Sequence, residues 1–335
     1  MNILVTGGAG YIGSHTAIAL LEAKHSVIIA DNLCNSSSGT IRKIESITGK
    51  KVTFYEMDVT VEEAVESLFK THSIDAVIHF AGLKSVGESV EKPLNYYSNN
   101  MISTLNLAKM CLKYGVNRFV FSSSATVYGD NIVPFEESMN LLPATNPYGE
   151  TKVMCERILT DLAHANPAFS VSLLRYFNPI GAHESGLIGE VPNGVPNNLM
   201  PYITQVAKGK LAKLRVFGND YPTADGTGLR DYIHVVDLAE GHVAALENLI
   251  EGVHTHNLGT GNGTSVLELV NAFEEANRIH VPYEVVGRRP GDIAVCYADV
   301  SKAARELGWK AKRNINDMCR DAWRFEVHNG TGKTT

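Results

Sequence analysis

Three side chains in the middle of the chain have the types and spacing for proton transfer to and from an oxygen atom. Tyr148 lies four residues before Lys152, so the two share one face of a helix, and Pro147 suits the first turn of that helix. A phenol has a pKa of about 10, and a nearby ammonium group favours its phenolate form. Ser124 ends a serine run after an apolar segment and could hydrogen-bond the same oxygen. Alone, a Tyr-x-x-x-Lys pair is more often a surface pair than a catalytic one, so its context decides.

The start of the chain carries a turn that suits a nucleotide. Gly7, Gly10 and Gly13 follow an apolar segment, residues 3–6, and precede a helical pattern. This spacing allows a tight turn, close approach of the backbone to a pyrophosphate, and close packing of helix on strand. Asp31 ends the next apolar segment, where its carboxylate would bind the adenosine hydroxyls and repel a 2′-phosphate, which favours NAD over NADP. Together with the tyrosine–lysine pair, this turn indicates a redox enzyme that binds NAD.

Two further segments that follow expected strands are candidates for the same cofactor site. Asp58 could reach the adenine amino group, and it could equally cap the helix that begins near Val61. Residues 80–84 offer a backbone of small residues beside the cofactor and, in Lys84, a partner for a phosphate. Both segments lie where open parallel sheets bind their ligands, at the carboxyl ends of strands.

These residues need a scaffold in which strands and helices alternate. Short β-branched segments alternate with helical patterns from residue 1 to about 177, which predicts an α/β protein with a doubly wound, Rossmann-type parallel sheet. The expected strands are 3–6, 26–30, 52–56, 76–80, 118–122 and 171–176. The expected helices between them are 13–23, 40–47, 61–70, 99–114 and 148–163.

A cluster of proline and glycine residues over 179–196 marks the predicted domain boundary, and no regular structure is expected within it. We predict a NAD-binding Rossmann domain over residues 1–177 and a smaller C-terminal α/β substrate domain over 178–335, with the option that segments around 230–260 pack back onto the first. The helices expected in the second domain are 198–208, 235–249, 266–276, 301–307 and 315–328.

Composition and charge argue against several other classes of protein. The chain of 335 residues has 44% apolar and 20% charged residues, and no apolar run approaches the roughly 20 residues of a membrane span. A net charge of −6 argues against nucleic acid as an obligate partner. The N-terminus lacks the features of a signal peptide and the five cysteines are widely spaced, so we expect a cytoplasmic protein with reduced thiols. No histidine pair has zinc-site spacing, and no metal is expected.

Motifs along nearly the whole chain resemble one known group of enzymes. Besides the glycine turn, Ser124 and the tyrosine–lysine pair, these motifs are the segments 31–36, 80–84, 122–129, 174–179, 196–201, 217–222 and 230–234. On these residues the chain resembles the extended short-chain dehydrogenase/reductase family and, within it, the UDP-hexose 4-epimerases. Such coverage is far more specific than the glycine turn alone.

The resemblance implies an isomerase that inverts C4 of a UDP-hexose, UDP-galactose to and from UDP-glucose, without net redox change. Tyr148 would take the proton of the 4-hydroxyl while the C4 hydride passes to NAD+. The 4-keto sugar would then turn over and receive the hydride on its opposite face, with NADH bound throughout. Lys152 would tune Tyr148 and hold the nicotinamide ribose, and Ser124 would orient the substrate oxygen. The resemblance also implies a homodimer that pairs the helices 99–114 and 148–163 of two subunits.

The resemblance further implies a set of residues for each ligand. Besides the catalytic Ser124, Tyr148 and Lys152, the NAD site would be lined by Gly7, Gly10, Tyr11, Ile12, Gly13, Asp31, Asn32, Leu33, Cys34, Asn35, Ser36, Asp58, Val59, Phe80, Ala81, Gly82, Leu83, Lys84, Asn99 and Phe177. Besides Ser124 and Tyr148, the UDP-sugar site would be lined by Asn178, Asn198, Leu199, Arg215, Val216, Phe217, Arg230, Arg289, Asp292 and Cys296. Arg230 and Arg289 would hold the diphosphate, because a guanidinium fork matches phosphate oxygens, although each alone could form a surface salt bridge.

Cys296 departs from part of the resembled group. Some bacterial members similar to this chain carry a bulky tyrosine at this position, beside the C2 group of the sugar. We hypothesise that the smaller cysteine leaves room for an N-acetyl group, so that UDP-GlcNAc and UDP-GalNAc are exchanged as well. In the alternative, neighbouring side chains close the gap.

Two other functions compete with epimerisation. A nucleotide-sugar 4,6-dehydratase shares the fold, NAD and the Tyr-x-x-x-Lys pair, but it needs an acid and a base where this chain has Ala125 and Thr126. A non-catalytic, NAD-binding redox sensor would have little reason to keep Ser124, Tyr148 and Lys152 together. Epimerisation is therefore the preferred hypothesis.

Overall fold

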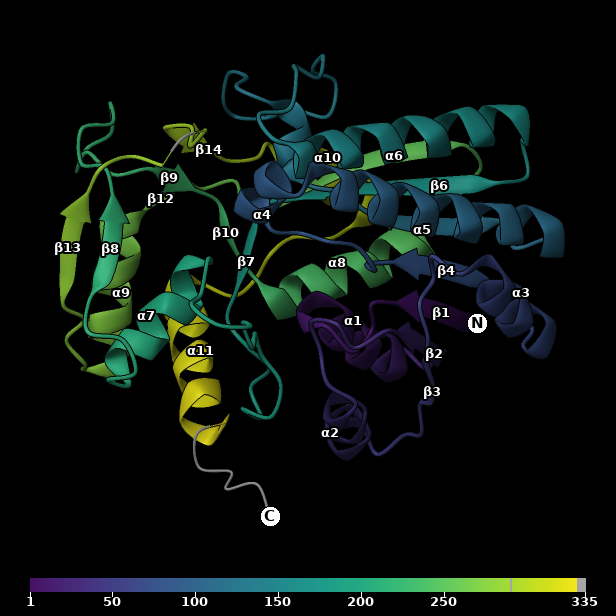
Figure 1. Cartoon of the computed structure of the whole chain (residues 1–335), viewed down its shortest axis with the longest axis horizontal. Helices are drawn as coiled ribbons and strands as arrows, with labels where there is room; N and C mark the ends of the chain where they lie inside the picture. The colour runs from purple at the N-terminus through teal and green to yellow at the C-terminus, as the bar shows by residue number, and fades with distance from the viewer. Residues whose placement is uncertain (290, 330–335) are drawn as a thin grey trace.

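The computed structural model of the chain describes residues 1–289 and 291–329. Its main element is a seven-stranded parallel sheet with the order β11-β6-β5-β4-β1-β2-β3 (Figure 1). The strands are β1 (Asn2–Thr6), β2 (Ser26–Asp31), β3 (Thr53–Glu56), β4 (Ala76–His79), β5 (Arg118–Ser122), β6 (Ser170–Tyr176) and β11 (Val253–Leu258). The predicted doubly wound, Rossmann-type α/β fold is confirmed, and β11 adds a seventh strand to the six that the sequence predicted.

Helices cover both faces of this sheet because successive residues of a strand point to opposite sides. Ile3 and Val5 of β1 belong to one buried core, and Leu4 between them belongs to the other. The first core is covered by α1 (Tyr11–Glu22), α2 (Gly39–Thr48), α8 (Val235–Glu247) and α10 (Ser301–Leu307). The second is covered by α3 (Glu62–Thr71), α5 (Pro93–Tyr114) and α6 (Pro147–Ala165). The central strands are therefore buried on both faces, which explains their nearly continuous apolar sequences.

The rest of the described residues forms three small sheets and a further helical layer. The sheets are β7 (Asn178–Ile180) with β10 (Tyr232–His234), β8 (Leu214–Phe217) with β13 (Tyr283–Val286), and β12 (Thr264–Ser265) with β9 (Leu229–Arg230) and β14 (Val295–Cys296). The helices are α7 (Leu199–Ala207), α9 (Val266–Asn277) and α11 (Ile315–Asn329), and they share a third buried core. Within residues 1–289 and 291–329, no helix has the length and hydropathy needed to cross a membrane.

The helix predicted at 99–114 begins earlier than expected. It starts at Pro93 and follows a short helix, α4 (Val86–Glu91), that the sequence analysis missed. Proline suits this first turn because its missing N–H has no partner there. Ser85 caps α4 by accepting a hydrogen bond from Glu88 N at 3.3 Å.

A short strand lies where the proline and glycine cluster predicted irregular structure. β7 includes Pro179 and pairs only with β10 in the described residues. Every strand of a two-stranded sheet is an edge strand, where proline is tolerated. The prediction of an irregular segment is therefore wrong for Pro179 and Ile180.

The division of the chain into domains after residue 177 stays a prediction. Two elements from the segment 230–260 pack on the main sheet: β11 pairs with β6, and α8 contacts α1. Residues 330–335, the end of the second predicted domain, lie outside the described residues.

Candidate active site

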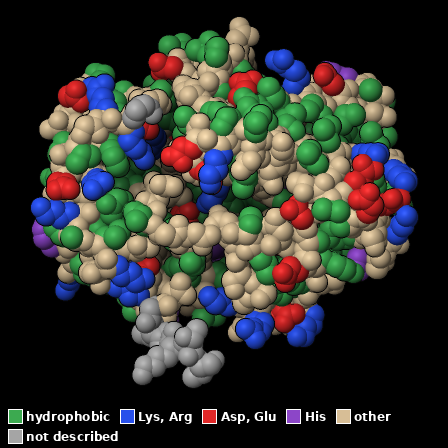
Figure 2. Space-filling view, in the orientation of Figure 1, with side chains coloured by type: hydrophobic (Ala, Val, Ile, Leu, Met, Phe, Trp, Pro, Cys, Tyr) green, Lys and Arg blue, Asp and Glu red, His purple; other side chains and the backbone are tan. Residues whose placement is uncertain are grey.

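The three predicted catalytic residues lie at the carboxyl ends of the central strands. Ser124 follows β5 and begins a short 3-10 helix, η1 (Ala125–Tyr128). Tyr148 lies in the first turn of α6, and Asn146 begins this helix by accepting a hydrogen bond from a backbone N–H at 2.9 Å. Figure 2 shows a hollow near the middle of the molecule, with charged side chains of both signs at its edge.

Lys152 is a buried lysine that is directed to the end of β5. Its side chain lies on α6 one turn after Tyr148, and the residue is 8% exposed. The ammonium group donates to Ser122 O at 2.6 Å and lies 4.8 Å from the ring centre of Phe121 and 5.8 Å from that of Tyr148. Burial lowers the pKa of Lys152 to about 8, although the charges of Cys155 and Glu156 oppose this shift.

Burial dominates the pKa of Tyr148 in the protein alone. Burial raises it above its usual value, and a hydrogen bond with Ser124 opposes the shift only in part. The sequence showed a nearby ammonium group, that of Lys152, but not the cost of removing the phenolate from water. In the protein alone, that cost dominates.

Sequence reasoning missed a buried ion pair behind these residues. Glu156, one turn after Lys152, accepts from Arg175 Nε at 3.0 Å and from Arg175 Nη2 at 2.6 Å. It also accepts from Ser123 Oγ at 2.5 Å, beside Ser124. The pair therefore ties the serine turn after β5 to the helix that carries Tyr148. Arginine in a strand and glutamate in a helix gave no local signal for this pairing.

The glycine turn has the geometry that the sequence predicted. Gly7 has a φ of +68°, and a methyl group there would lie 2.7 Å from Ala81 N. A methyl group on Gly13 would collide with Gly7 O. Gly10 precedes α1 and provides no side-chain cap, so the first N–H groups of α1 have no such partner in the described residues. An uncapped helix N-terminus beside a close backbone approach fits a dinucleotide phosphate.

Asp31 organises the loop that follows β2. One carboxylate oxygen accepts from Ala9 N at 2.9 Å, next to the glycine turn. The other accepts from Leu33 N at 2.9 Å and from Ser36 Oγ at 2.8 Å. Leu33 has a φ of 58°, an unusual value for a residue with a branched side chain. The carboxylate thus joins two cofactor-side loops, while its role toward a ribose stays a prediction.

Asp58 lies beside this loop and does not cap the next helix. It accepts from Thr60 N at 2.8 Å and Thr60 Oγ1 at 2.7 Å, whereas the N-cap of α3 is Val61. Asn32 Nδ2 donates to its other oxygen at 3.2 Å. Burial raises the pKa of Asp58, but these hydrogen bonds outweigh that effect and hold it below its usual value. The capping alternative is wrong, and Asp58 stays a candidate for the adenine.

The other residues predicted for NAD lie at the same edge of the sheet. Tyr11 and Ile12 head α1, Cys34 and Asn35 lie in the loop after β2, Val59 follows β3, Phe80, Ala81, Gly82, Leu83 and Lys84 follow β4, Asn99 lies in α5, and Phe177 follows β6. The structure therefore brings the whole predicted set to the carboxyl ends of the strands, where the assigned contacts stay predictions.

Asn100, which the sequence analysis missed, joins the loop after β4 to α6, the helix that carries Tyr148. Its Oδ1 accepts from Leu83 N at 2.8 Å, and its Nδ2 donates to Leu83 O at 3.0 Å. The same Nδ2 donates to Thr151 Oγ1 at 3.0 Å, and Thr151 Oγ1 donates to Tyr148 O at 2.7 Å. A polar residue on the buried face of a helix was the available signal.

The residues predicted for the UDP-sugar are placed less uniformly. Asn178 begins β7, and Asn198 and Leu199 begin α7. In β8, Arg215 is exposed, Phe217 is half-buried, and Val216 is only 1% exposed within the third core. Since the side chain of Val216 is packed away, any contact of this residue with a ligand must use its backbone.

Arg230, Arg289 and Asp292 form one charged cluster. Asp292 Oδ2 accepts from Arg289 Nε at 2.9 Å, and Asp292 Oδ1 lies 3.9 Å from Arg230 Nη2. The guanidinium of Arg289 lies 4.7 Å from the ring centre of Phe217. The two predicted diphosphate ligands are thus brought together, with one carboxylate between them in the protein alone.

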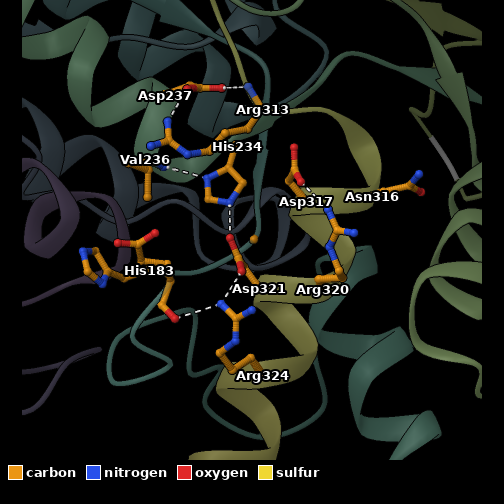
Figure 3. Close-up of polar contacts among 12 residues, drawn as sticks. His183, His234, Val236, Asp237, Arg313, Asn316, Asp317, Arg320, Asp321 and Arg324 are labelled. Carbon is orange, nitrogen blue, oxygen red and sulfur yellow. Dashed lines mark hydrogen bonds and ion pairs between the residues drawn. The ribbon is translucent and has the colours of Figure 1, made fainter.

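The rest of the motif 230–234 has a structural role. Asp231 is buried and accepts from Thr260 N at 2.8 Å, Thr260 Oγ1 at 2.7 Å and Gly261 N at 3.0 Å. His234 Nδ1 accepts from Val236 N at 3.1 Å at the start of α8, and His234 Nε2 lies 3.2 Å from Asp321 on α11 (Figure 3). These residues hold β10 and its neighbours in place and leave Arg230 as the charged member near Asp292.

Two other features bear on the competing functions. Ala125 is 7% exposed, and Thr126 Oγ1 donates to Ser124 Oγ at 3.0 Å, so η1 supplies no acid–base pair for elimination of water. Among residues 1–289 and 291–329, no group of three or more His, Cys, Asp or Glu side chains could hold a metal ion.

Known proteins resemble this chain over its whole length. The family model for GDP-mannose 4,6-dehydratase matches residues 4–322. UDP-glucose 4-epimerase of Bacillus subtilis (strain 168) is 60% identical over 335 residues, covering 99% of this chain and 98% of that protein.

Solved structures of 4-epimerases also resemble this chain over nearly its whole length. UDP-glucose 4-epimerase from Bifidobacterium longum, in complex with NAD+ and UDP, has a TM-score of 0.96 and 52% identity over 99% of this chain and 100% of that one. The UDP-Glc/GlcNAc 4-epimerase from Campylobacter jejuni has a TM-score of 0.84 and 38% identity over 98% of this chain and 99% of that one. With relatives this similar along its full length, the chain belongs to the family of NAD-dependent UDP-glucose 4-epimerases, isomerases of the extended short-chain dehydrogenase/reductase group.

Proposed function

We propose that this protein interconverts UDP-galactose and UDP-glucose by inverting C4 of the hexose, with NAD as a bound cofactor. The observation that carries the proposal is that Ser124, Tyr148 and Lys152 lie at the sheet edge that also carries the glycine turn. A proton-transfer group and a dinucleotide cradle at one edge suit oxidation and reduction of a sugar alcohol.

Tyr148, Ser124 and Lys152 have separate roles in the reaction at C4 of the hexose. When bound, NAD+ supplies a reversible hydride acceptor. Tyr148 accepts the proton of the 4-hydroxyl and later returns it, and Ser124 holds the same oxygen by a hydrogen bond. Because burial raises the pKa of Tyr148, positive charge must stabilise its phenolate, and Lys152 supplies such a charge from one turn away.

The charged cluster explains how the nucleotide could be held while the hexose turns over. Arg230 and Arg289 bind the diphosphate, and Asp292 neutralises their charge when no diphosphate is present. Binding energy concentrated on the nucleotide leaves few contacts to the sugar. A keto sugar that must present both faces to the cofactor needs that freedom.

The substrate range extends to N-acetylated UDP-sugars. Cys296 is 9% exposed, and it shares a buried cluster with Ala125 and Phe177 beside the serine turn. This position supports a role at the sugar, since a cysteine side chain is small. In a Cys296→Tyr variant, turnover of UDP-GalNAc should fall relative to that of UDP-galactose. An unchanged ratio would mean that neighbouring side chains already close the gap.

The functional unit is a homodimer formed through α5 and α6. Leu94, Ile102 and Leu105 of α5 are 78%, 42% and 45% exposed, and Ile102 and Leu105 share one helical face. Light scattering should give a mass near twice 36.4 kDa. Leu105→Glu should shift the protein toward the monomer, whereas Ile250→Glu, at a site that is also exposed, should not. A monomeric wild-type protein contradicts this proposal.

A cytoplasmic location stays a prediction.

The decisive experiment needs no added cofactor. Purified protein is incubated with UDP-galactose, the sugar products are identified, and the bound cofactor is followed by its absorbance. Appearance of UDP-glucose without release of reduced cofactor supports a self-contained epimerase. A 4-keto-6-deoxy product would establish the dehydratase instead, and bound NAD without turnover of UDP-galactose or UDP-GalNAc would favour the redox sensor.

A further inference from the structure

The segment between β7 and α7, residues 181–198, runs along loops predicted to line the cofactor, and we call it the strap. In Figure 1 it leaves β7 and passes between the labels α11 and α1 before it reaches α7. Gly181 O accepts a hydrogen bond from Tyr11 OH at 2.8 Å, at the head of α1. Arg324 of α11 donates to Glu184 O at 2.8 Å. The first half of the strap is thus hydrogen-bonded to α1 on one side and to α11 on the other.

Glu190 closes the second half of the strap. Its Oε1 lies 3.3 Å from Lys84 Nζ, in the cofactor-side loop after β4, and accepts from Asn198 Nδ2 at 2.6 Å. Because Glu190 and Asn198 end the segment 190–198, this hydrogen bond closes the segment into a loop. The Glu190 side chain is 10% exposed, so these two partners take the place of most of its water contacts.

The tip of this closed loop reaches a second cofactor-side loop. Asn193 Nδ2 donates to Asn35 Oδ1 at 3.1 Å and to Cys34 O at 3.4 Å, in the loop after β2. The strap therefore contacts the glycine turn region, the loop predicted to bind the adenosine ribose, and the lysine predicted to bind a phosphate. All three contacts are polar, and each is weak enough to open and close.

We propose that the strap retains the bound cofactor, with Glu190 as the positioning residue that closes it through Lys84 and Asn198. This inference rests on the proposed function, because it takes the loops after β1, β2 and β4 as the NAD site. It explains a requirement of that function: a cofactor that is reduced and reoxidised within one turnover must not leave between the two steps. The strap supplies a physical barrier to its release.

The test measures release of NAD from the purified holoenzyme. The protein is diluted, free and bound fractions are separated at intervals, and NAD in each is quantified. Glu190→Ala removes both contacts and should release NAD about tenfold faster than wild type. Glu190→Gln keeps an acceptor for Asn198 but loses the ion pair with Lys84, and it should show an increase of about threefold. Glu184→Gln carries the same change on the exposed side of the strap and should leave the rate unchanged.

The rate of NAD release is also measured for Asn193→Ala. Asn193 is exposed, so its substitution should leave the folded structure intact. The variant should also speed release, while its thermal midpoint without cofactor matches that of wild type. Wild-type release rates in both Glu190→Ala and Asn193→Ala would overturn the strap proposal. Turnover of UDP-galactose by the wild-type protein distinguishes the two hypotheses. If wild type turns over UDP-galactose but both variants release NAD at the wild-type rate, only the strap proposal is refuted. If wild type retains NAD but does not turn over UDP-galactose, only the proposed function is refuted.

Discussion

Removing one partner of the buried pair of Glu156 and Arg175 should destabilise the folded protein by several kilocalories per mole. Their side chains are 5% and 7% exposed, and two hydrogen bonds of 3.0 and 2.6 Å join them. Glu156→Gln removes the negative charge and leaves a buried guanidinium unpaired, which costs about 3–5 kcal/mol. Unfolding a chain of 335 residues has an entropy of about 0.7 kcal/mol per K, so the thermal midpoint should fall by about 4–7 K.

Chemical and thermal unfolding of the cofactor-free protein would measure this loss. Asp161→Asn, an exposed change on the same helix, is the matched control and should stay within about 0.5 kcal/mol of wild type. A double variant, Glu156→Leu with Arg175→Met, removes both charges and should recover much of the loss. If Glu156→Gln costs no more than Asp161→Asn, the reasoning from burial and pairing is refuted.

Three further predictions concern the site. Tyr148→Phe should lower turnover by at least about 100-fold and leave the NAD content unchanged, and retained turnover would exclude Tyr148 as the base. Burial lowers the pKa of Lys152 to about 8, so between pH 8 and 10.5 the unfolded chain binds more protons than the folded protein. The free energy of unfolding should therefore rise with pH over this range. Lys152→Met should remove the contribution of Lys152 to this rise, as measured by urea unfolding at several pH values. Asn100→Ala breaks the link between Leu83 and α6, which carries Tyr148, and should lower kcat by about tenfold or more, whereas Asn95→Ala on the exposed side of α5 should have no effect in the same assay.

Local patterns were enough to predict the fold and most of the candidate site. The glycine turn, Asp31 and the Tyr148/Lys152 pair each sit at the junction of two elements, where residue type and local backbone are linked directly. Parallel strands that end at one edge then bring these junctions together. Burial, which no motif encodes, raises the pKa of Tyr148 in the protein alone, so the sequence offered no measure of how easily the phenol loses its proton there.

By itself, the sequence determined the alternation of strands and helices over the main sheet, the glycine turn and the candidate acid–base pair, because these depend on residues within a few positions of one another. Tertiary structure alone decided which distant residues support them. Glu156 with Arg175, Asn100 with Leu83, and Glu190 with Lys84 join elements that are far apart along the chain. Such pairs form only when the packing of distant elements sets the separation of the two partners, and this condition leaves no periodic or local signal in the sequence.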